Sequence, residues 1–213
     1  MSTTTFWLIR HGETQWNADR RLQGWLDIPL NDTGLRQAKQ LSGMLRPPRF
    51  DAAIDIIVSS DLSRAADTAR IAAGHFGIAI EAFAPLRERN YGIYEGQDWA
   101  KLEDPNGAKV DFHSPDWVVD QGETLTQFRD RIDKAFAELV QRYAGKNVLA
   151  FSHGGVIDIA WRLATGAGFD VPRPGPILNT SINQFSIDGQ GQWQLLDWGH
   201  TAHLDEAALD DVI

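Results

Sequence analysis

Residues 8–17 are Leu8-Ile9-Arg10-His11-Gly12-Glu13-Thr14-Gln15-Trp16-Asn17. The stretch begins as an apolar strand and changes at once to a cation, an imidazole and a glycine. In open α/β sheets, ligands bind beyond the carboxyl ends of the strands. The stretch therefore predicts a buried strand of an α/β fold, with a ligand-binding edge immediately after Ile9.

Apolar, β-branched runs recur along the chain and alternate with segments of helical period. Strands are expected at residues 6–9, 54–58, 78–83 and 148–151, and helices at 33–45, 62–73, 125–143 and 156–163. Near the C-terminus, residues 182–187 and 193–197 flank Asp188-Gly189-Gln190-Gly191 and predict a hairpin. We therefore expect an α/β fold in three layers, with helices on both faces of a mostly parallel central sheet and an antiparallel pair at one edge.

The composition limits the domain organisation and the partners. A chain of 213 residues suits one domain spanning residues 1–213. Its 20 basic and 29 acidic residues give a net charge of −9, which argues against binding to nucleic acid or to an anionic membrane surface. Because neither a signal peptide nor a stretch of about 18 uninterrupted apolar residues is found, we expect a cytoplasmic protein. The oligomeric state stays open, with a homodimer as one option.

Two stretches, residues 96–121 and 166–180, break the alternation of strands and helices and predict loops. The first is long for a connection, and functional loops are often of this kind. It also contains Trp99, Phe112 and Trp117. Residues 96–121 are therefore interpreted as a lid-like insertion whose aromatic side chains contact part of a substrate.

Three further strands lead to polar side chains. The strand at 148–151 continues into Ser152-His153-Gly154-Gly155, the strand at 54–58 leads to Arg64, and the strand at 78–83 leads to Glu88. The carboxyl ends of parallel strands meet at one edge of a sheet. We therefore expect two histidines, two arginines and a carboxylate together at that edge, namely His11, His153, Arg10, Arg64 and Glu88.

This set suits phosphoryl transfer through a histidine. A neutral imidazole such as that of His11 is a competent nucleophile near neutral pH and forms a covalent phospho-intermediate. Arg10 and Arg64, with His153, match the oxygens of phosphate on which negative charge is spread. Glu88 can protonate a leaving alkoxide and then activate water. Since the chain has no cysteine, thiolate catalysis and cysteine-ligated zinc are excluded.

The same motifs resemble those of the histidine phosphatase superfamily, which includes the cofactor-dependent phosphoglycerate mutases. The resemblance covers residues 6–203 through ordered blocks, which are Arg10-His11-Gly12-Glu13 with Trp16-Asn17, Gln23-Gly24, Asp27-Ile28-Pro29-Leu30, Gly34 with Gln37-Ala38, Ser59-Ser60-Asp61-Leu62-Ser63-Arg64-Ala65, Leu86-Arg87-Glu88, Tyr91-Gly92-Ile93-Tyr94-Glu95-Gly96, Gly122-Glu123-Thr124 and Ser152-His153-Gly154-Gly155. It implies a phosphohistidine on His11 and no metal or other cofactor. It also implies that phosphate is held by Arg10, Arg64 and His153, that Glu88 is the proton donor, and that other residues lie near the phosphate, namely Asn17, Gln23, Gly24 and Gly154.

Within this resemblance, hydrolysis is favoured over mutase-type transfer. Mutases of the family typically carry extra arginines between the catalytic acid and the second histidine, whereas residues 96–121 hold Lys101 and Lys109 against six acidic residues and no arginine. Mutases also tend to have asparagine at the position of Gly155. We therefore predict a phosphatase-branch enzyme that hydrolyses a small phosphate monoester, with phosphoglycerate mutase-type transfer as the alternative. Sugar phosphates, nucleotides and phosphorylated ribazole all stay open as substrates.

Two remote alternatives come from other classes of function. Residues 150–154 approximate a serine-esterase elbow around Ser152, with Asp197 and His200 downstream in the order of a triad. However, Ala150 replaces the first glycine of that motif, and the esterase interpretation gives the two arginines no role. A non-catalytic module that binds a phospho-ligand is the other alternative, and the presence of both histidines and Glu88 argues against it.

Overall fold

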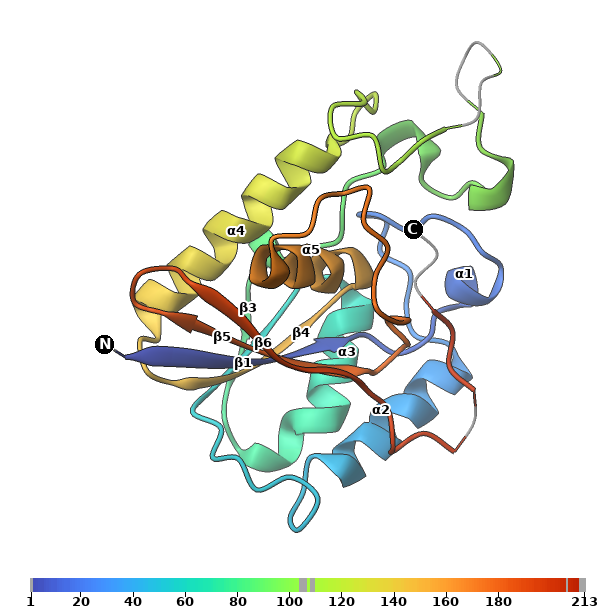
Figure 1. Ribbon diagram of the computed structural model, residues 1–213. Helices are drawn as coiled ribbons and strands as arrows, with labels where there is room; N and C mark the ends of the chain where they lie inside the picture. Colours follow the sequence, from blue (N-terminus) through green and yellow to red (C-terminus); the bar gives the residue numbers. More distant parts are fainter. Residues whose placement is uncertain (1, 104–106, 108–109, 206, 211–213) are drawn as a thin grey trace.

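The structure is a computed structural model that describes residues 2–103, 107, 110–205 and 207–210 (Figure 1). Within them, one six-stranded sheet has the order β3-β2-β4-β1-β5-β6. Its strands are β1 (Thr3–Arg10), β2 (Ile56–Ser59), β3 (Ile80–Ala82), β4 (Asn147–Ser152), β5 (Ile182–Asp188) and β6 (Trp193–His200). The first four run parallel, while β5 pairs antiparallel with β1 and β6. The predicted mostly parallel sheet with an antiparallel pair at one edge is confirmed.

Strand β1 lies in the middle of the sheet although it comes first in the chain. Its parallel neighbour β4 ends in register with it, with Arg10 opposite Ser152. The N–H of His11 donates to the Ser152 carbonyl at 2.9 Å and so continues the ladder by one residue. Because the two strands end together, His11 and His153 emerge side by side from the same edge.

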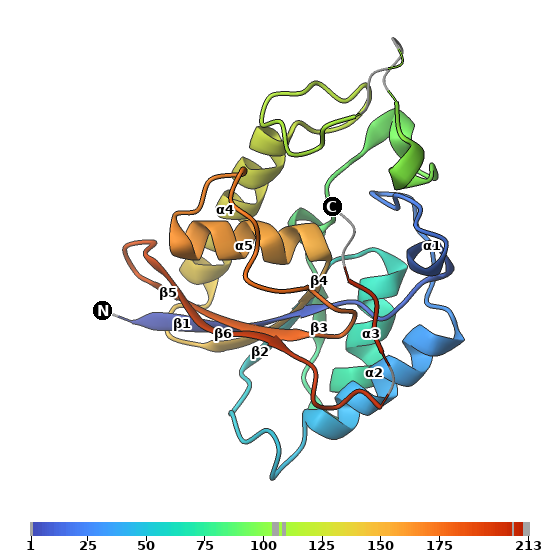
Figure 2. The same cartoon turned by 45° about the vertical axis from the view of Figure 1, so that its right-hand side comes forward.

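Helices cover both faces of the sheet, as predicted (Figure 2). Helices α2 (Asp32–Met44) and α3 (Ser63–Ala73) lie on one face, α4 (Leu125–Arg142) and α5 (Gly154–Thr165) on the other, and the short α1 (Gln15–Ala18) follows β1. Successive side chains of a strand point to opposite faces. Leu8 accordingly packs with α4 and α5, and Ile9 packs with α2 and α3. Among the described residues, no helix is long and apolar enough to cross a membrane.

Capping residues determine where the helices begin. Thr124 and Gln127 form the predicted capping box at the start of α4. Helix α5 begins two residues before the predicted Val156, with His153 as its N-cap residue, so this histidine lies directly at a helix N-terminus. Short elements too small to show a period were not predicted; they are α1 and the 3-10 turns at Gly74–Phe76, Ala84–Leu86, Gly92–Tyr94 and Trp99–Lys101.

The described part of residues 96–121 lies next to the N-terminal end of α4 (Figure 1). It is irregular, as expected, apart from the 3-10 turn at Trp99–Lys101. It contributes to a small apolar cluster that is separate from the two clusters packed on the sheet. This cluster is formed by Leu22, Tyr91, Tyr94, Leu102, Val110, Phe112 and Val119, with Trp99 and Trp117 packed against it. Residues 104–106, Ala108 and Lys109 of this stretch lie outside the described residues.

Candidate active site

His11 follows β1 at the predicted edge and is 3% exposed. Its Nδ1 lies 2.7 Å from the carbonyl oxygen of Gly12. Because a carbonyl can only accept, Nδ1 carries the proton and the lone pair is on Nε2. Gly12 is held in turn by Thr68, whose hydroxyl accepts from the Gly12 N–H at 2.9 Å. The backbone thus sets the tautomer in which Nε2 is the nucleophilic atom.

The surroundings of His11 also keep its ring neutral. Burial lowers its pKa well below the ordinary histidine value, and the positive charges of Arg64 and Arg10 lower it further. The hydrogen bond to Gly12 acts in the opposite direction and is the smaller effect. Since only the neutral imidazole has a lone pair to donate, His11 is in its nucleophilic form at neutral pH.

His153 lies beside His11, and the centroids of the two rings are 5.2 Å apart. Its Nε2 is 2.8 Å from the hydroxyl oxygen of Ser60, which the sequence analysis did not single out. Its Nδ1 is buried and makes no hydrogen bond with any described residue. Burial lowers the pKa of His153, and the positive charge of Arg64 adds to this effect. Two neutral rings at this separation are close enough to contact one phosphate group.

Arg64 lies in the first turn of α3 and is fully buried. Its Nη2 donates to the Gly24 carbonyl at 2.7 Å and its Nη1 to the Leu26 carbonyl at 3.0 Å. Its Nε makes no hydrogen bond with any described residue. Burying a cation is costly unless negative charge lies nearby. Three carboxylates raise its pKa against the effect of burial, those of Glu88, Asp27 and Glu95.

Arg10, the last residue of β1, is held by the far end of the chain. It is 1% exposed, and its Nη1 donates to the carbonyls of Ile177 at 2.6 Å and Leu209 at 2.8 Å. The Leu209 carbonyl also accepts from the N–H of Asn179 at 3.1 Å. Both acceptors are backbone atoms from segments far along the chain, and they orient the guanidinium.

Glu88 enters from the loop after β3 and is 8% exposed. Its Oε1 accepts from the Arg89 N–H at 2.8 Å and its Oε2 from the Gly155 N–H at 3.1 Å. Gly155 lies in the first turn of α5, where the helix dipole favours negative charge. A β-carbon at Gly155 would lie 2.3 Å from Oε1. Glycine at this position therefore allows the helix to approach the carboxylate.

Arg131 of α4 holds the loop that carries Glu88. It donates to the carbonyls of Pro85 at 2.8 Å, Arg87 at 3.0 Å and Glu88 at 2.9 Å, and it pairs with both carboxylate oxygens of Glu123. Sequence reasoning missed it, because an arginine among the polar residues of an amphipathic helix is usually exposed to solvent. The one indirect signal was the block Gly122-Glu123-Thr124.

The predicted site residues other than His153 and Gly154 line one small pocket. It is lined by Arg10, His11, Asn17, Arg21, Leu22, Gln23, Gly24, Arg64, Glu88 and Tyr91. The side-chain oxygens of Asn17 and Gln23 accept from Thr14 at 3.0 and 2.9 Å. If either residue contacts phosphate, it therefore does so through its amide NH₂ group. Gly154, the first residue of α5, lies next to His153 without lining this pocket.

Two further cavities share lining residues with the pocket or with each other. The nearer one shares Tyr91 with the pocket and includes Phe112, and the outer one, of about 580 Å³, shares His113 with the nearer one. Trp117 instead stacks on Phe112 within the apolar cluster that includes Leu22 and Tyr91, with ring centroids 6.2 Å apart. Of the three aromatic residues predicted to contact a substrate, Phe112 is the one that lines these cavities.

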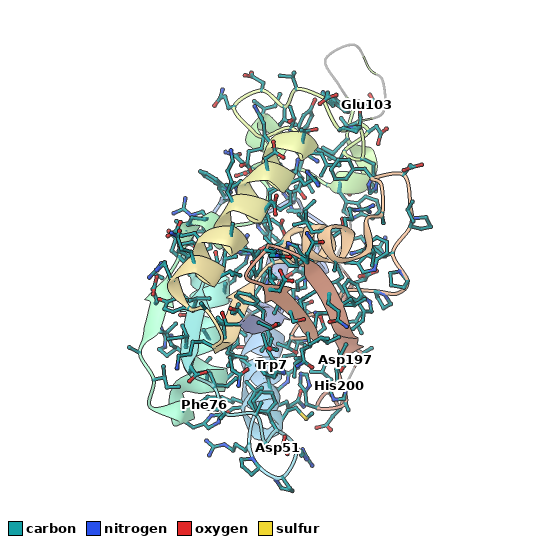
Figure 3. The ribbon with its side chains drawn as sticks, turned by 60° about the vertical axis from the view of Figure 1, so that its left-hand side comes forward. Trp7, Asp51, Phe76, Glu103, Asp197 and His200 are labelled. Atoms are coloured by element: carbon teal, nitrogen blue, oxygen red, sulfur yellow. The ribbon has the colours of Figure 1, made fainter. Side chains whose placement is uncertain are left out.

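The serine-esterase alternative is not supported by the geometry. The Ser152 hydroxyl donates to the Leu86 carbonyl at 2.7 Å. Asp197 and His200 lie together on β6 (Figure 3). Because β1 and β5 separate β4 from β6, three strand spacings, on the order of 14 Å, lie between Ser152 and these residues. The triad is therefore not assembled.

Behind His11, Thr180 has φ +59°, a backbone conformation that is unusual for a β-branched residue. Its N–H donates to the Arg10 carbonyl at 3.1 Å, and its hydroxyl lies 3.1 Å from Nε2 of His203. His203 is 6% exposed, and burial together with the charge of His200 lowers its pKa to about 4. A buried neutral histidine thus packs against the backbone that supports the site.

We expect this burial to make folding sensitive to mild acid. Between pH 6.5 and 4, the unfolded chain binds a proton at His203 and the folded chain does not, so the free energy of unfolding falls as the pH falls. For this residue alone the loss reaches about 3 kcal/mol at pH 4. Urea unfolding at successive pH values measures it, and His203→Gln should flatten the dependence. An equally steep dependence in the variant would contradict the assignment.

Buried guanidinium groups are rare in a protein interior unless an anion or a carboxylate is paired with them. This pocket holds two of them and the neutral imidazole of His11, with His153 beside it, at the carboxyl edge of a parallel sheet, and so has the features of an α/β protein that binds phosphate groups. The family comparison agrees with this class. The chain belongs to the histidine phosphatase superfamily (branch 1), whose family model matches residues 6–201.

Relatives of this chain carry both phosphatase and mutase-like names. It is 35% identical over 209 residues to phosphoglycerate mutase-like protein 4 of Arabidopsis thaliana, covering 95% of this chain and 87% of that protein. The structure of Bacillus stearothermophilus YhfR matches with a TM-score of 0.82 and 30% identity, over 94% of this chain and 98% of that one. Phosphoserine phosphatase from Entamoeba histolytica, in complex with 3-phosphoglyceric acid, matches with a TM-score of 0.77 and 28% identity, over 94% and 98% of the two chains.

Proposed function

We propose that this protein is a phosphomonoesterase that hydrolyses a small phosphorylated metabolite through a phosphohistidine on His11. The observation that carries the proposal is the neutral His11 ring, whose Nε2 lone pair is left available by the bond from Nδ1 to Gly12. Arg10 and Arg64 lie on the same pocket, and Glu88 lines it as well. The pocket thus combines a nucleophile, phosphate-binding cations and a proton donor.

In the first step, Nε2 of His11 attacks the phosphorus atom, and the bond from phosphorus to the leaving-group oxygen breaks. Arg10, Arg64 and His153 donate to the three non-bridging oxygens, on which the charge of the transition state is spread. The protonated carboxyl group of Glu88 gives its proton to the departing oxygen, so that the product is an alcohol.

In the second step, the Glu88 carboxylate takes a proton from a water molecule, and the oxygen of that water attacks the phosphorus atom. The bond between Nε2 and phosphorus breaks, and the electron pair returns to His11. Inorganic phosphate leaves, and both the imidazole and the carboxyl group recover their starting states.

Net hydrolysis is favoured over mutase-type transfer because Arg162 and Arg89, the arginines that line the nearer cavity, already make hydrogen bonds within the protein. Arg162 is committed to the Asp158 carboxylate at 2.8 Å. Arg89 donates to the carbonyls of Phe112 at 2.7 Å and Glu123 at 3.1 Å, and its Nη2 makes no bond with a described residue. Arg162 is thus already paired with a carboxylate, and Arg89 keeps only its Nη2 group for a second anionic group of a substrate. Mutase-type transfer is the second candidate, because a relative bears that name.

The leaving group is proposed to extend along α5, with residues 96–121 as a lid. Gly155 borders the Glu88 carboxylate and, together with Phe112, lines the nearer cavity. His113 lines both cavities. Since Glu88 protonates the leaving oxygen, the rest of the leaving group has to lie on its side of the phosphate. Phe112 and His113 are therefore proposed to contact the leaving group and to influence which substrate binds.

A panel of phosphate monoesters, assayed for released phosphate with and without EDTA, tests the proposal. We expect turnover that survives EDTA, because Arg10 and Arg64 supply the positive charge that metal ions supply in other phosphoryl-transfer sites. Activity should also differ with the apolar bulk of the leaving group, because Phe112 lines the path. Loss of turnover on chelation, restored by zinc or magnesium, would contradict metal independence.

The same panel separates hydrolysis from transfer. One reaction contains 3-phosphoglycerate with bisphosphoglycerate, and both released phosphate and isomerised phosphoglycerate are measured. We expect released phosphate to exceed isomerised product. Isomerisation without phosphate release would favour the mutase, and the absence of both from every reaction would favour the non-catalytic module.

A further inference from the structure

The carboxylate of Glu95 accepts hydrogen bonds from backbone N–H groups of two separate segments. Its Oε1 accepts from Trp25 at 2.8 Å and from Tyr91 at 3.1 Å, and its Oε2 accepts from Leu26 at 3.1 Å. A carboxylate that accepts several backbone N–H groups holds those segments in one geometry. Glu95 thus ties the loop of residues 23–27 to the turn that follows Glu88.

The loop lies directly on this carboxylate. Gly24 has φ +52°, and a β-carbon there would lie 2.0 Å from Oε1 of Glu95. Glycine is therefore required at this position by both backbone conformation and space. The Gln23-Gly24 block, which the resemblance places near phosphate, thus packs against a side chain for which the proposed mechanism has no role.

One peptide group connects Glu95 with Arg64. The unit between Gly24 and Trp25 donates its N–H to Glu95 and accepts from Nη2 of Arg64 at its carbonyl, at 2.8 and 2.7 Å. Because a peptide unit is planar and trans, its N–H and C=O point in opposite directions. Fixing the N–H on Glu95 therefore fixes the direction in which the carbonyl meets the guanidinium.

Further contacts reinforce this arrangement. Nη1 of Arg64 donates to the Leu26 carbonyl at 3.0 Å, and Oδ1 of Asp27 accepts from the N–H of Ser63 at 2.7 Å, at the start of α3. The negative charge of Glu95 also counteracts part of the effect of burial on the pKa of Arg64. The buried guanidinium is thus held from one side by a loop whose shape depends on Glu95.

We infer that Glu95 is a positioning residue that directs Arg64 at the phosphate through the Gly24–Trp25 peptide. The inference rests on the proposed function, in which Arg64 binds phosphate oxygens. It assigns to Glu95 no contact with substrate and no proton transfer.

The experiment measures binding of inorganic phosphate and inhibition by orthovanadate in wild type and in Glu95→Gln. The amide keeps the size of the side chain but replaces one acceptor with NH₂, so the N–H of Trp25 or that of Leu26 loses its acceptor, and Arg64 loses a nearby charge. We expect both ligands to bind about tenfold more weakly, within the range of coupling between neighbouring residues. Activity should show a raised KM and a lowered kcat on p-nitrophenyl phosphate.

Asp188→Asn is the matched control. Asp188 is a partly buried carboxylate that accepts from the N–H groups of Gln190 at 2.8 Å and Gln192 at 3.0 Å, in the hairpin far from the pocket. We expect this variant to lose thermal stability without loss of phosphate binding. Unchanged phosphate binding in Glu95→Gln, or an equal loss in both variants, would overturn the inference. If Glu95→Gln does not fold, Glu95→Asp, which withdraws the carboxylate by one methylene, replaces it under the same criteria.

A double-mutant cycle with Arg64→Met tests whether Glu95 affects phosphate binding through Arg64. If Glu95 acts through Arg64, the Glu95→Gln change should have little further effect on phosphate binding once the guanidinium is removed. Additive losses would overturn the route through Arg64. Failure of the proposed function is distinguishable, because wild type would then hydrolyse no ester of the panel, whether or not it binds phosphate.

Discussion

Replacing His11 with alanine is expected to abolish turnover. The change removes the Nε2 lone pair, and no other described side chain in the pocket offers a comparable nucleophile at neutral pH. Loss of a nucleophile that acts as one unit with its neighbours typically costs at least about four orders of magnitude in kcat. Quenching with alkaline SDS after incubation with ³²P-labelled substrate should trap a phosphoenzyme in wild type, stable in base and labile in acid, and none in the variant.

His75→Ala provides the control, because His75 follows the C-terminal end of α3, away from Arg64, and contacts the Leu45 carbonyl at 2.9 Å. This variant should retain full labelling. Phosphate binding should persist in His11→Ala, since Arg10 and Arg64 are unchanged. Label that appeared on Ser152, or that persisted in His11→Ala, would show that His11 is not the nucleophile.

Replacing Glu88 with glutamine should impair turnover in a manner that depends on the leaving group. The amide can still accept from the N–H of Arg89 or Gly155, so the loop should keep its shape, but it cannot supply a proton. A positioned proton donor contributes a factor of about a hundred to ten thousand. We expect a loss of this size on an alkyl phosphate and a much smaller loss on p-nitrophenyl phosphate, whose phenolate leaves without protonation.

Rapid quench adds a second measurement. Because the same carboxylate activates water, hydrolysis of the phosphoenzyme should be slowed in the variant, and phosphoenzyme should accumulate. Glu138→Gln is the matched control, because its carboxylate lies exposed on α4. Equal losses on aryl and alkyl esters, with an unchanged pH profile, would assign Glu88 a structural role.

Much of this site was predictable because parallel strands end at a common edge. Residues 6–9 and 148–151 were identified from apolar runs alone, and their register puts His11 beside His153. The same rule leads from β2 to Arg64 and from β3 to Glu88. The family resemblance then supplied roles that composition and periodicity do not contain.

The parts that were missed have no recognisable local pattern. Arg10 is oriented by the carbonyls of Ile177 and Leu209, and a backbone carbonyl is present at every residue. Arg131 and Glu95 are charged residues in segments where charge usually means exposure to solvent. Their roles depend on which backbone atoms the folded chain brings to them, and no spacing in the sequence encodes that.

The central place of β1 also matters while the chain is being synthesised. Its two neighbours, β4 and β5, both come from the last third of the chain, and the residue opposite Arg10 is made about 140 residues after it. At the usual elongation rate of 5–20 residues per second, this strand waits about 7 to 30 s for its first partner. Phe6, Leu8 and Ile9, all fully buried at the end, are without their sheet neighbours throughout that interval. An apolar strand with unpaired edges is a template for aggregation, so the nascent chain is most exposed to aggregation during this interval.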